Sequence, residues 1–302
     1  MAQLEPYMGS NYYLWKYLPS IPAAVIFALL FLVATGAHCF RLFKTRLWFC
    51  LPFVVGGIME VIGYCARAAA HDRTGDLIPY IIQNILILLP PVLFAASIYM
   101  VLGRIIRAVH GEPYSLIRVN ILTKVFVLGD AVSFFVQGGG GGIMAQGENA
   151  DTGEKIIVGG LILQIVMFGL FIITAVVFQT RYQKRKVAAP AYDAMGWKMS
   201  MYMLYGVSAL IMIRNIFRTV EFAAGQDGYL LSHEWTVYVF DSILMLTVMV
   251  LFLVWYPSNL KQSPEAQWMH SDGTDVNLAE RGRDSDYNVR FDNTNYSALV
   301  TK

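Results

Sequence analysis

Charged side chains stand inside a stretch of the sequence that is otherwise apolar enough to cross a membrane. The run at about 199–224 contains Arg214, Arg218 and Glu221, which share one helical face because they are four and three residues apart. A charge near the centre of a membrane helix costs about 3 kcal/mol on insertion scales. These side chains therefore need polar partners on other helices, and those partners define the candidate site.

Polar residues seven positions apart recur in other apolar runs. The pairs are Glu60 and Arg67, Asp130 and Gln137, Arg214 and Glu221, and Glu234 and Asp241. Seven residues are nearly two helical turns, so each pair shares a face. We predict that these faces turn inward and line a polar cavity open towards the outer side of the membrane, since intramembrane charges usually mark a pathway or a ligand site.

The candidate ligand-binding residues are the inward-facing polar side chains of these runs. They are Glu60, Tyr64, Arg67, Gln83, Asp130, Gln137, Gln164, Arg214, Arg218, Glu221, Tyr238 and Asp241. The alternative interpretation is a set of ion pairs that only hold the helices together, such as Glu60 with Arg67 or Arg218 with Asp241.

Asp130 is the deepest of these residues and forms the floor of the predicted cavity. The nearest cation on its own run, Lys124, lies closer to the interface. Burial away from water favours the neutral carboxyl, so Asp130 could exchange a proton. The alternative is a protonated carboxyl that only hydrogen-bonds a neighbour.

Two features predict bending. Pro90, beside Pro91, should kink the run at about 77–104. Five consecutive glycines begin at Gly138, and Gly138, Gly139 and Gly140 are candidate hinge residues with Pro90. Close packing of the glycines against another helix is the alternative.

The elements that position these residues follow from hydropathy. The chain has 302 residues, of which 56% are hydrophobic and 15% charged, whereas a soluble globule carries roughly 25% charged residues. We predict an all-α polytopic membrane protein, a seven-transmembrane helix bundle over 20–257. A short extracellular segment, 1–19, precedes it, and a disordered cytosolic tail, 258–302, follows. The spans are expected at about 20–40, 47–69, 77–104, 119–145, 156–180, 199–224 and 235–257.

The basic residues set the expected orientation. Seventeen Lys and Arg lie in the tail and in the connections on its side, against three on the other side. The positive-inside rule therefore places the N-terminus outside and the C-terminus in the cytosol. The plasma membrane is the expected location, with internal membranes as the alternative. The basic connection after the fifth span and the tail are candidate contacts for a cytosolic partner, and nucleic acid is not an expected partner.

Several catalytic motifs are absent from the sequence. It contains no Gly-x-x-x-x-Gly-Lys-Ser/Thr loop, no Gly-x-Ser-x-Gly elbow and no His-x-x-x-His pair. We therefore expect neither an enzyme nor a bound cofactor or metal.

The order and spacing of the polar residues, taken together, resemble the fungal RTA-like proteins, the lipid-translocating exporter family. The resemblance covers about residues 12–257. The motifs that carry it include Glu60-x-x-Gly63-Tyr64-x-x-Arg67, Asp130-x-x-Ser133-x-x-x-Gln137-Gly138-Gly139-Gly140, Gly160-Leu161-x-x-Gln164, Arg214-x-x-Phe217-Arg218-x-x-Glu221 and Glu234-x-x-x-Tyr238-x-Phe240-Asp241.

The resemblance implies a role in lipid asymmetry, in release of sphingoid long-chain bases and in resistance to toxic amphiphiles. The expected partners are therefore membrane lipids, either a sphingoid base or a phospholipid. Seven spans also describe a receptor-like lipid sensor, or a regulator of lipid asymmetry that transports nothing itself. The sequence does not determine the oligomeric state.

Overall fold

A computed structural model describes residues 15, 17–72, 74, 77–109, 111–144, 150–184, 197–225 and 228–256, and these contain helices and no strand. The helical part belongs to a compact unit that extends to Ser258. The predicted tail, 258–302, and most of the predicted N-terminal segment, 1–19, lie outside the described residues.

Seven helices are long and apolar enough to cross a membrane, which confirms the predicted helical bundle. Their elements are α1 (Ile21–Thr45), α2 (Leu51–Ala69), α3 (Leu77–Leu88) with α4 (Pro90–Ala108), α5 (Val119–Met144), α6 (Ala150–Lys184), α7 (Trp197–Ala223), and α9 (Glu234–Val237) with η6 (Tyr238–Ile243) and α10 (Leu244–Val254). Short helical turns, among them η2 (Trp48–Cys50), η4 (Glu112–Tyr114) and α8 (Tyr229–Ser232), connect them.

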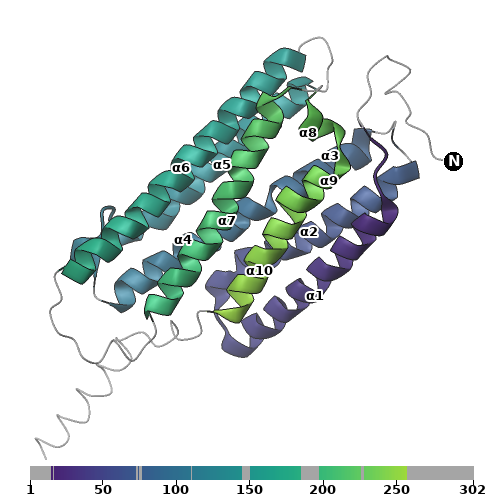
Figure 1. Cartoon of the computed structure of the whole chain (residues 1–302). Helices are drawn as coiled ribbons and strands as arrows, with labels where there is room; N and C mark the ends of the chain where they lie inside the picture. The colour runs from purple at the N-terminus through teal and green to yellow at the C-terminus, as the bar shows by residue number, and fades with distance from the viewer. Residues whose placement is uncertain are drawn as a thin grey trace, which may run out of the picture. The chain divides into compact units, whose positions relative to one another are not determined.

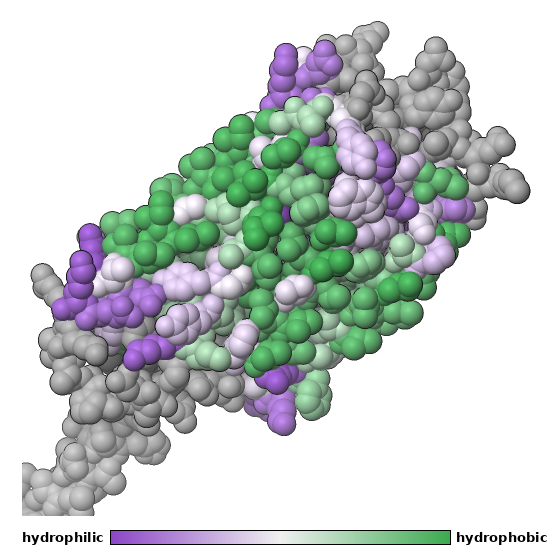
Figure 2. Space-filling view, viewed as in Figure 1, coloured by the Kyte–Doolittle hydropathy of each residue, from purple (hydrophilic) through white to green (hydrophobic). Residues whose placement is uncertain are grey.

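Apolar side chains form a belt over much of the face of the bundle that Figure 2 shows. Val33, Leu128 and Phe135 have 72%, 65% and 74% of their surface exposed. A soluble protein rarely leaves so large an apolar surface in contact with water. The belt is the surface that a helical bundle presents to lipid.

The interior is organised around α4, which makes up most of the span Tyr80–Ala108, the span with the largest buried share of the seven. It packs against α2, α5 and α7, while α5 and α6 lie side by side along their length (Figure 1). Polar side chains on α2 and on α5 therefore both lie next to α4.

The third span is interrupted where its prolines predict. Helix α3 ends at Leu88 and α4 begins at Pro90. Proline has no N–H, so Pro90 and Pro91 leave the carbonyls of Leu86 and Ile87 without their helical donors.

Two glycines let α2 approach this break. A Cβ on Gly63 would lie 2.8 Å from the Ile87 side chain, and one on Gly56 would lie 3.3 Å from the Pro90 carbonyl oxygen. Larger residues would therefore push α2 away from the interruption.

The glycine run at 138–142 is helical throughout. Gly140 packs closely on α6, because a Cβ there would lie 2.8 Å from the carbonyl oxygen of Gly153. A Cβ on Gly138 or Gly139 would meet nothing within 4 Å. Close packing thus explains one of the three candidate hinge glycines, and hinging itself stays a prediction.

The seventh span contains a π-helical segment, η6. Such wide turns are rare and often lie at functional sites. Tyr238, Asp241 and Ser242 of this segment are all buried. The Ser242 hydroxyl lies 3.4 Å from the Val237 carbonyl oxygen five residues earlier, so it can donate to a carbonyl in the widened turn.

Candidate functional site

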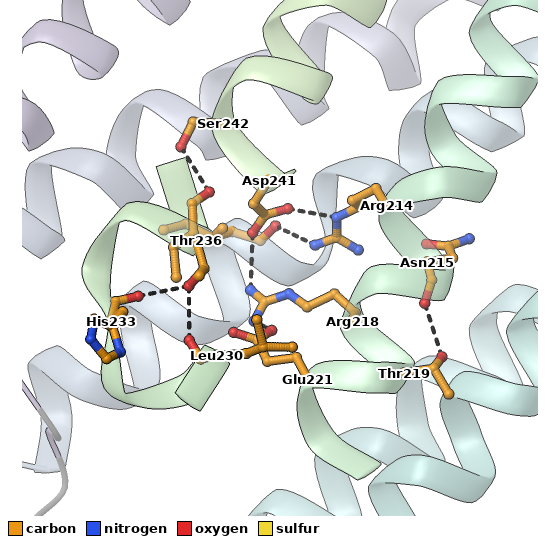
Figure 3. A network of polar contacts seen from close by, with 12 residues as sticks. Arg214, Asn215, Arg218, Thr219, Glu221, Leu230, His233, Thr236, Asp241 and Ser242 are labelled. Atoms are coloured by element: carbon orange, nitrogen blue, oxygen red, sulfur yellow. Dashed lines mark hydrogen bonds and ion pairs between the residues drawn. The ribbon is translucent and has the colours of Figure 1, made fainter. Parts of the chain in front are cut away.

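Two arginines of α7 converge on one carboxylate of the seventh span (Figure 3). Arg214 Nε lies 2.6 Å from Asp241 Oδ1, and Arg218 Nη2 lies 2.9 Å from Asp241 Oδ2. Arg218 also reaches Glu221 with Nη1, at 2.8 Å from Oε2. The Arg218–Asp241 pair that we considered from the sequence is therefore formed. We refer to Arg214, Arg218, Glu221 and Asp241 as the arginine cluster.

The interruption of the third span contributes to this cluster. Arg214 Nη2 donates to the Ile87 carbonyl oxygen at 3.4 Å. That carbonyl is free because Pro91, four residues later, has no N–H to offer it. The proline pair thus supplies a backbone acceptor to a buried guanidinium.

Arg67 occupies a second polar centre, nearer the end of α2. It donates to Tyr238 Oη at 3.1 Å, to Tyr17 Oη at 3.0 Å and to Glu234 Oε1 at 2.9 Å. Its guanidinium also lies 5.9 Å from the ring centroid of Trp15. The Glu60–Arg67 pair that we considered under the alternative interpretation is not formed, because Glu234 and three aromatic side chains surround Arg67 instead.

Glu234 also ties the start of α1 to this centre. Its Oε1 accepts the backbone N–H of Ser20 at 2.8 Å. One carboxylate therefore joins the first, second and seventh spans.

Glu60 differs from the buried acids Asp241 and Glu221, which are both paired with arginines. It is 1% exposed, and its Oε2 has no hydrogen-bond partner among the described residues. Tyr64, one turn further along α2, hydrogen-bonds with Ser242 rather than with Glu60. Asp241, Arg214 and Arg218 all lie within electrostatic range of Glu60.

Asp130 lies in a separate polar centre between α4 and α5. Its Oδ2 accepts the Tyr99 hydroxyl at 2.7 Å, and its Oδ1 has no partner in the described part of the chain. Tyr99 packs against Phe126 and Phe171, with ring centroids 5.5 and 4.5 Å apart. The carboxyl is thus held by one hydroxyl among aromatic rings.

The amides that we grouped with Asp130 also pair with each other. Gln137 Nε2 donates to Gln164 Oε1 at 2.8 Å, joining α5 to α6. Gln83 on α3 is buried, and its Oε1 has no described partner.

The expectation of one polar cavity with Asp130 at its floor therefore needs correction. The residues do turn inward, but α4 lies between the Asp130 centre on α5 and Glu60 on α2, because α4 packs against both helices. The arginines and acids also contact one another directly, which satisfies most of their charge without a ligand. Ligand binding by any of them stays a prediction.

Four hydrogen-bonding side chains that contact these residues were missing from the predicted site: Tyr17, Tyr99, Glu234 and Ser242. Glu234 appeared in the sequence only as the companion of Asp241, at the outer edge of its span. Tyr99 and Ser242 carry no charge, so their position in an apolar run did not identify them as partners of buried polar groups. The seven-residue spacing from Asp241 was the one clue to Glu234.

The fold and these centres define a multi-pass membrane protein with buried charges between its helices. Residues 53–263 match the family model described as RTA1 like protein. The chain belongs to this family, as the sequence resemblance predicted.

Three relatives from Saccharomyces cerevisiae are similar to this chain over most of its length. Protein RTM1 is 34% identical over 288 residues, covering 82% of this chain and 92% of the relative. Protoporphyrin uptake protein 1 is 33% identical over 282 residues, covering 81% and 92%. Sphingoid long-chain base transporter RSB1 is 24% identical over 293 residues, covering 85% and 76%. No solved structure matches the chain significantly.

Proposed function

We propose that this protein moves amphiphilic lipids, such as sphingoid long-chain bases, across its membrane. One relative is named a sphingoid long-chain base transporter and another a protoporphyrin uptake protein, so two names in the family describe movement of an amphiphile. This transport would contribute to lipid asymmetry and to resistance against toxic amphiphiles.

The observation that carries the proposal is the buried Glu60 carboxyl, whose Oε2 has no hydrogen-bond partner among the described residues. A sphingoid base has an ammonium group, which a buried carboxylate without its own cation can bind. Glu221 and Asp241, which are also candidate ligand-binding acids, are already paired with arginines. Glu60 is therefore the first candidate for the head group.

Flux of a labelled sphingoid base through reconstituted vesicles tests the proposal. We expect the native chain to raise the flux above that of empty vesicles and Glu60→Gln to reduce it at least tenfold. Asp151→Asn is the matched control, because Asp151 is an exposed acid at the start of α6. Native flux equal to that of empty vesicles would reject transport, and unchanged flux in Glu60→Gln would reject this binding residue.

A carboxylate-bearing amphiphile is the second candidate substrate, because the protoporphyrin uptake protein is more similar to this chain than the sphingoid base transporter is. Its carboxylates would have to displace Asp241 or Glu221 from the arginine cluster. Flux of protoporphyrin from loaded vesicles distinguishes the two candidate substrates, since protoporphyrin, unlike the sphingoid base, requires Arg214 and Arg218 to change partners.

The proposal includes a location and a topology. The protein would act at the plasma membrane, with an external N-terminus, and without an enzymatic step. A receptor-like sensor is the competing function. It would show a ligand-dependent change at the basic connection after α6 or at the tail, together with no net lipid flux.

A further inference from the structure

The arginine cluster is balanced in charge without Glu60. Arg214 and Arg218 carry two positive charges, and Asp241 and Glu221 carry two negative charges at contact distance. A third carboxylate beside them would leave one uncompensated negative charge in the membrane interior, which is strongly unfavourable. Glu60 therefore needs a bound cation or a proton.

The titratable and charged groups around Glu60 come from several elements. Those that act on it directly are Arg214 and Arg218 on α7, Asp241 on the seventh span and Tyr64 on α2 itself. Arg67, which acts on Tyr64, contacts Glu234 and Tyr238, and Glu221 contacts Arg218. The charged ones among them are paired with one another, as described above. None of them forms an ion pair with Glu60 in the described part of the chain.

The interrupted third span makes this position favourable for a cation. Glu60 lies one helical turn from Gly63, which packs on Leu86 and Ile87 at the end of α3. The carbonyl end of a helix carries partial negative charge. Of the two carbonyls that the prolines leave without helical donors, that of Ile87 accepts from Arg214, which leaves that of Leu86. Discontinuous membrane helices use such carbonyls to hold coordinating ions.

We propose that Glu60 binds a proton and the ammonium group of the amphiphile in alternation, so that the protein exchanges one for the other. The protonated Glu60 carboxyl loses its proton to water when the ammonium arrives, and the carboxylate forms an ion pair with that ammonium. The cluster keeps the same net charge in both states. This inference rests on the proposed function and gives the coupling ion that moves with the amphiphile.

Proton release on binding is the first test. The full chain in detergent and weak buffer receives a short-chain sphingoid base, and a pH indicator records the medium. We expect close to one proton released per molecule bound for the native chain and for Asp151→Asn. Glu60→Gln should release none, and the N-acetylated base, which has no ammonium, should release none from any variant.

Three further measurements test whether Glu60 is the group that releases the proton. Glu60→Asp should retain proton release with weaker binding, and the melting temperature of Glu60→Gln reports whether that variant is folded. Release that persists in folded Glu60→Gln but disappears in Asp130→Asn would overturn the assignment and point to the other buried carboxyl.

Vesicles separate this proposal from the proposed function. A proton gradient of one pH unit should accumulate the sphingoid base about tenfold through the native chain, because one unit corresponds to a factor of ten for one-to-one exchange. Flux that ignores the gradient would leave transport standing and overturn exchange. Absence of any flux would reject the proposed function itself.

Discussion

Asp241 is the acid on which the buried Arg214 and the partly buried Arg218 depend. Removing one partner of a buried pair leaves an uncompensated charge and costs about 3–5 kcal/mol. We expect Asp241→Asn to lower the melting temperature in detergent by roughly 10 °C, given about 2–4 °C per kcal/mol for a chain of this size. Asp151→Asn, at an exposed acid, should leave it unchanged. Equal melting temperatures for the two variants would contradict the pairing.

Asp130 is held differently, by the Tyr99 hydroxyl and, among the residues that the structure describes, by no cation. An asparagine oxygen can still accept from Tyr99, so Asp130→Asn should cost less than about 1 kcal/mol. Tyr99→Phe removes the donor and leaves the buried carboxyl without a partner, which costs about 1–3 kcal/mol. Thermal unfolding of the two variants should therefore rank Tyr99→Phe as the less stable.

The Asp130→Asn variant also tests a functional role for this carboxyl. Full transport by Asp130→Asn would remove the hypothesis that this carboxyl exchanges a proton, since an amide cannot replace it. Lost transport at native stability would support the hypothesis.

At the scale of helices, the α5–α6 contact depends on one glycine of the five. A Cβ at Gly140 would lie 2.8 Å from a backbone oxygen of α6, whereas one at Gly139 meets nothing. Gly140→Ala should therefore destabilise the protein. Gly139→Ala should be neutral or stabilise it by up to about 1 kcal/mol, because alanine favours helix over glycine. Opposite effects of the two variants on the melting temperature are the expected result.

The π-helical segment is stabilised by a hydroxyl that serves two elements. Ser242 interacts with the Val237 carbonyl and hydrogen-bonds Tyr64 on α2. Ser242→Ala leaves both groups buried without this partner and should cost about 1–3 kcal/mol. Thr247→Ala is the control, because the Thr247 hydrogen bond to Ile243 is exposed. A stability loss of equal size in the control would contradict this role.

Hydropathy and spacing predicted the seven spans and the inward polar faces, because a bilayer penalises every exposed charge. The interruption at Pro90 was also predictable, since proline lacks the donor that a helix needs. The partners were harder to predict. Arg67 pairs with Glu234 rather than with Glu60, because pairing across helices depends on how each helix is rotated, and spacing within one helix does not give that rotation.

The division into separate polar centres was also beyond the sequence. Asp130 and Glu60 both appeared as inward acids, and only the position of α4 between α5 and α2 separates them. The π-helical turn at Tyr238–Ile243 could not be predicted from the sequence, because its residues fit an ordinary α-helix equally well.

At the scale of the whole molecule, the distribution of basic residues predicts the orientation. Seventeen Lys and Arg on the side of the tail against three on the other favour an external N-terminus. An epitope tag at the N-terminus should bind antibody on intact cells, and a tag at the C-terminus should bind only after permeabilisation. The reverse pattern would contradict the predicted topology.

The order in which the chain is synthesised gives the last span a further importance. Glu234, the acid that pairs with Arg67, lies 167 residues after it in the sequence, and Asp241 lies 27 residues after Arg214. Since a nascent chain emerges from its N-terminus, Arg67 is made long before the carboxylate that neutralises it. A message that ends before residue 234 would therefore yield a product with buried cations that have lost these acids. Such a product should be recognised as incomplete and degraded, so premature stop codons anywhere upstream of the seventh span should behave as complete losses of the protein.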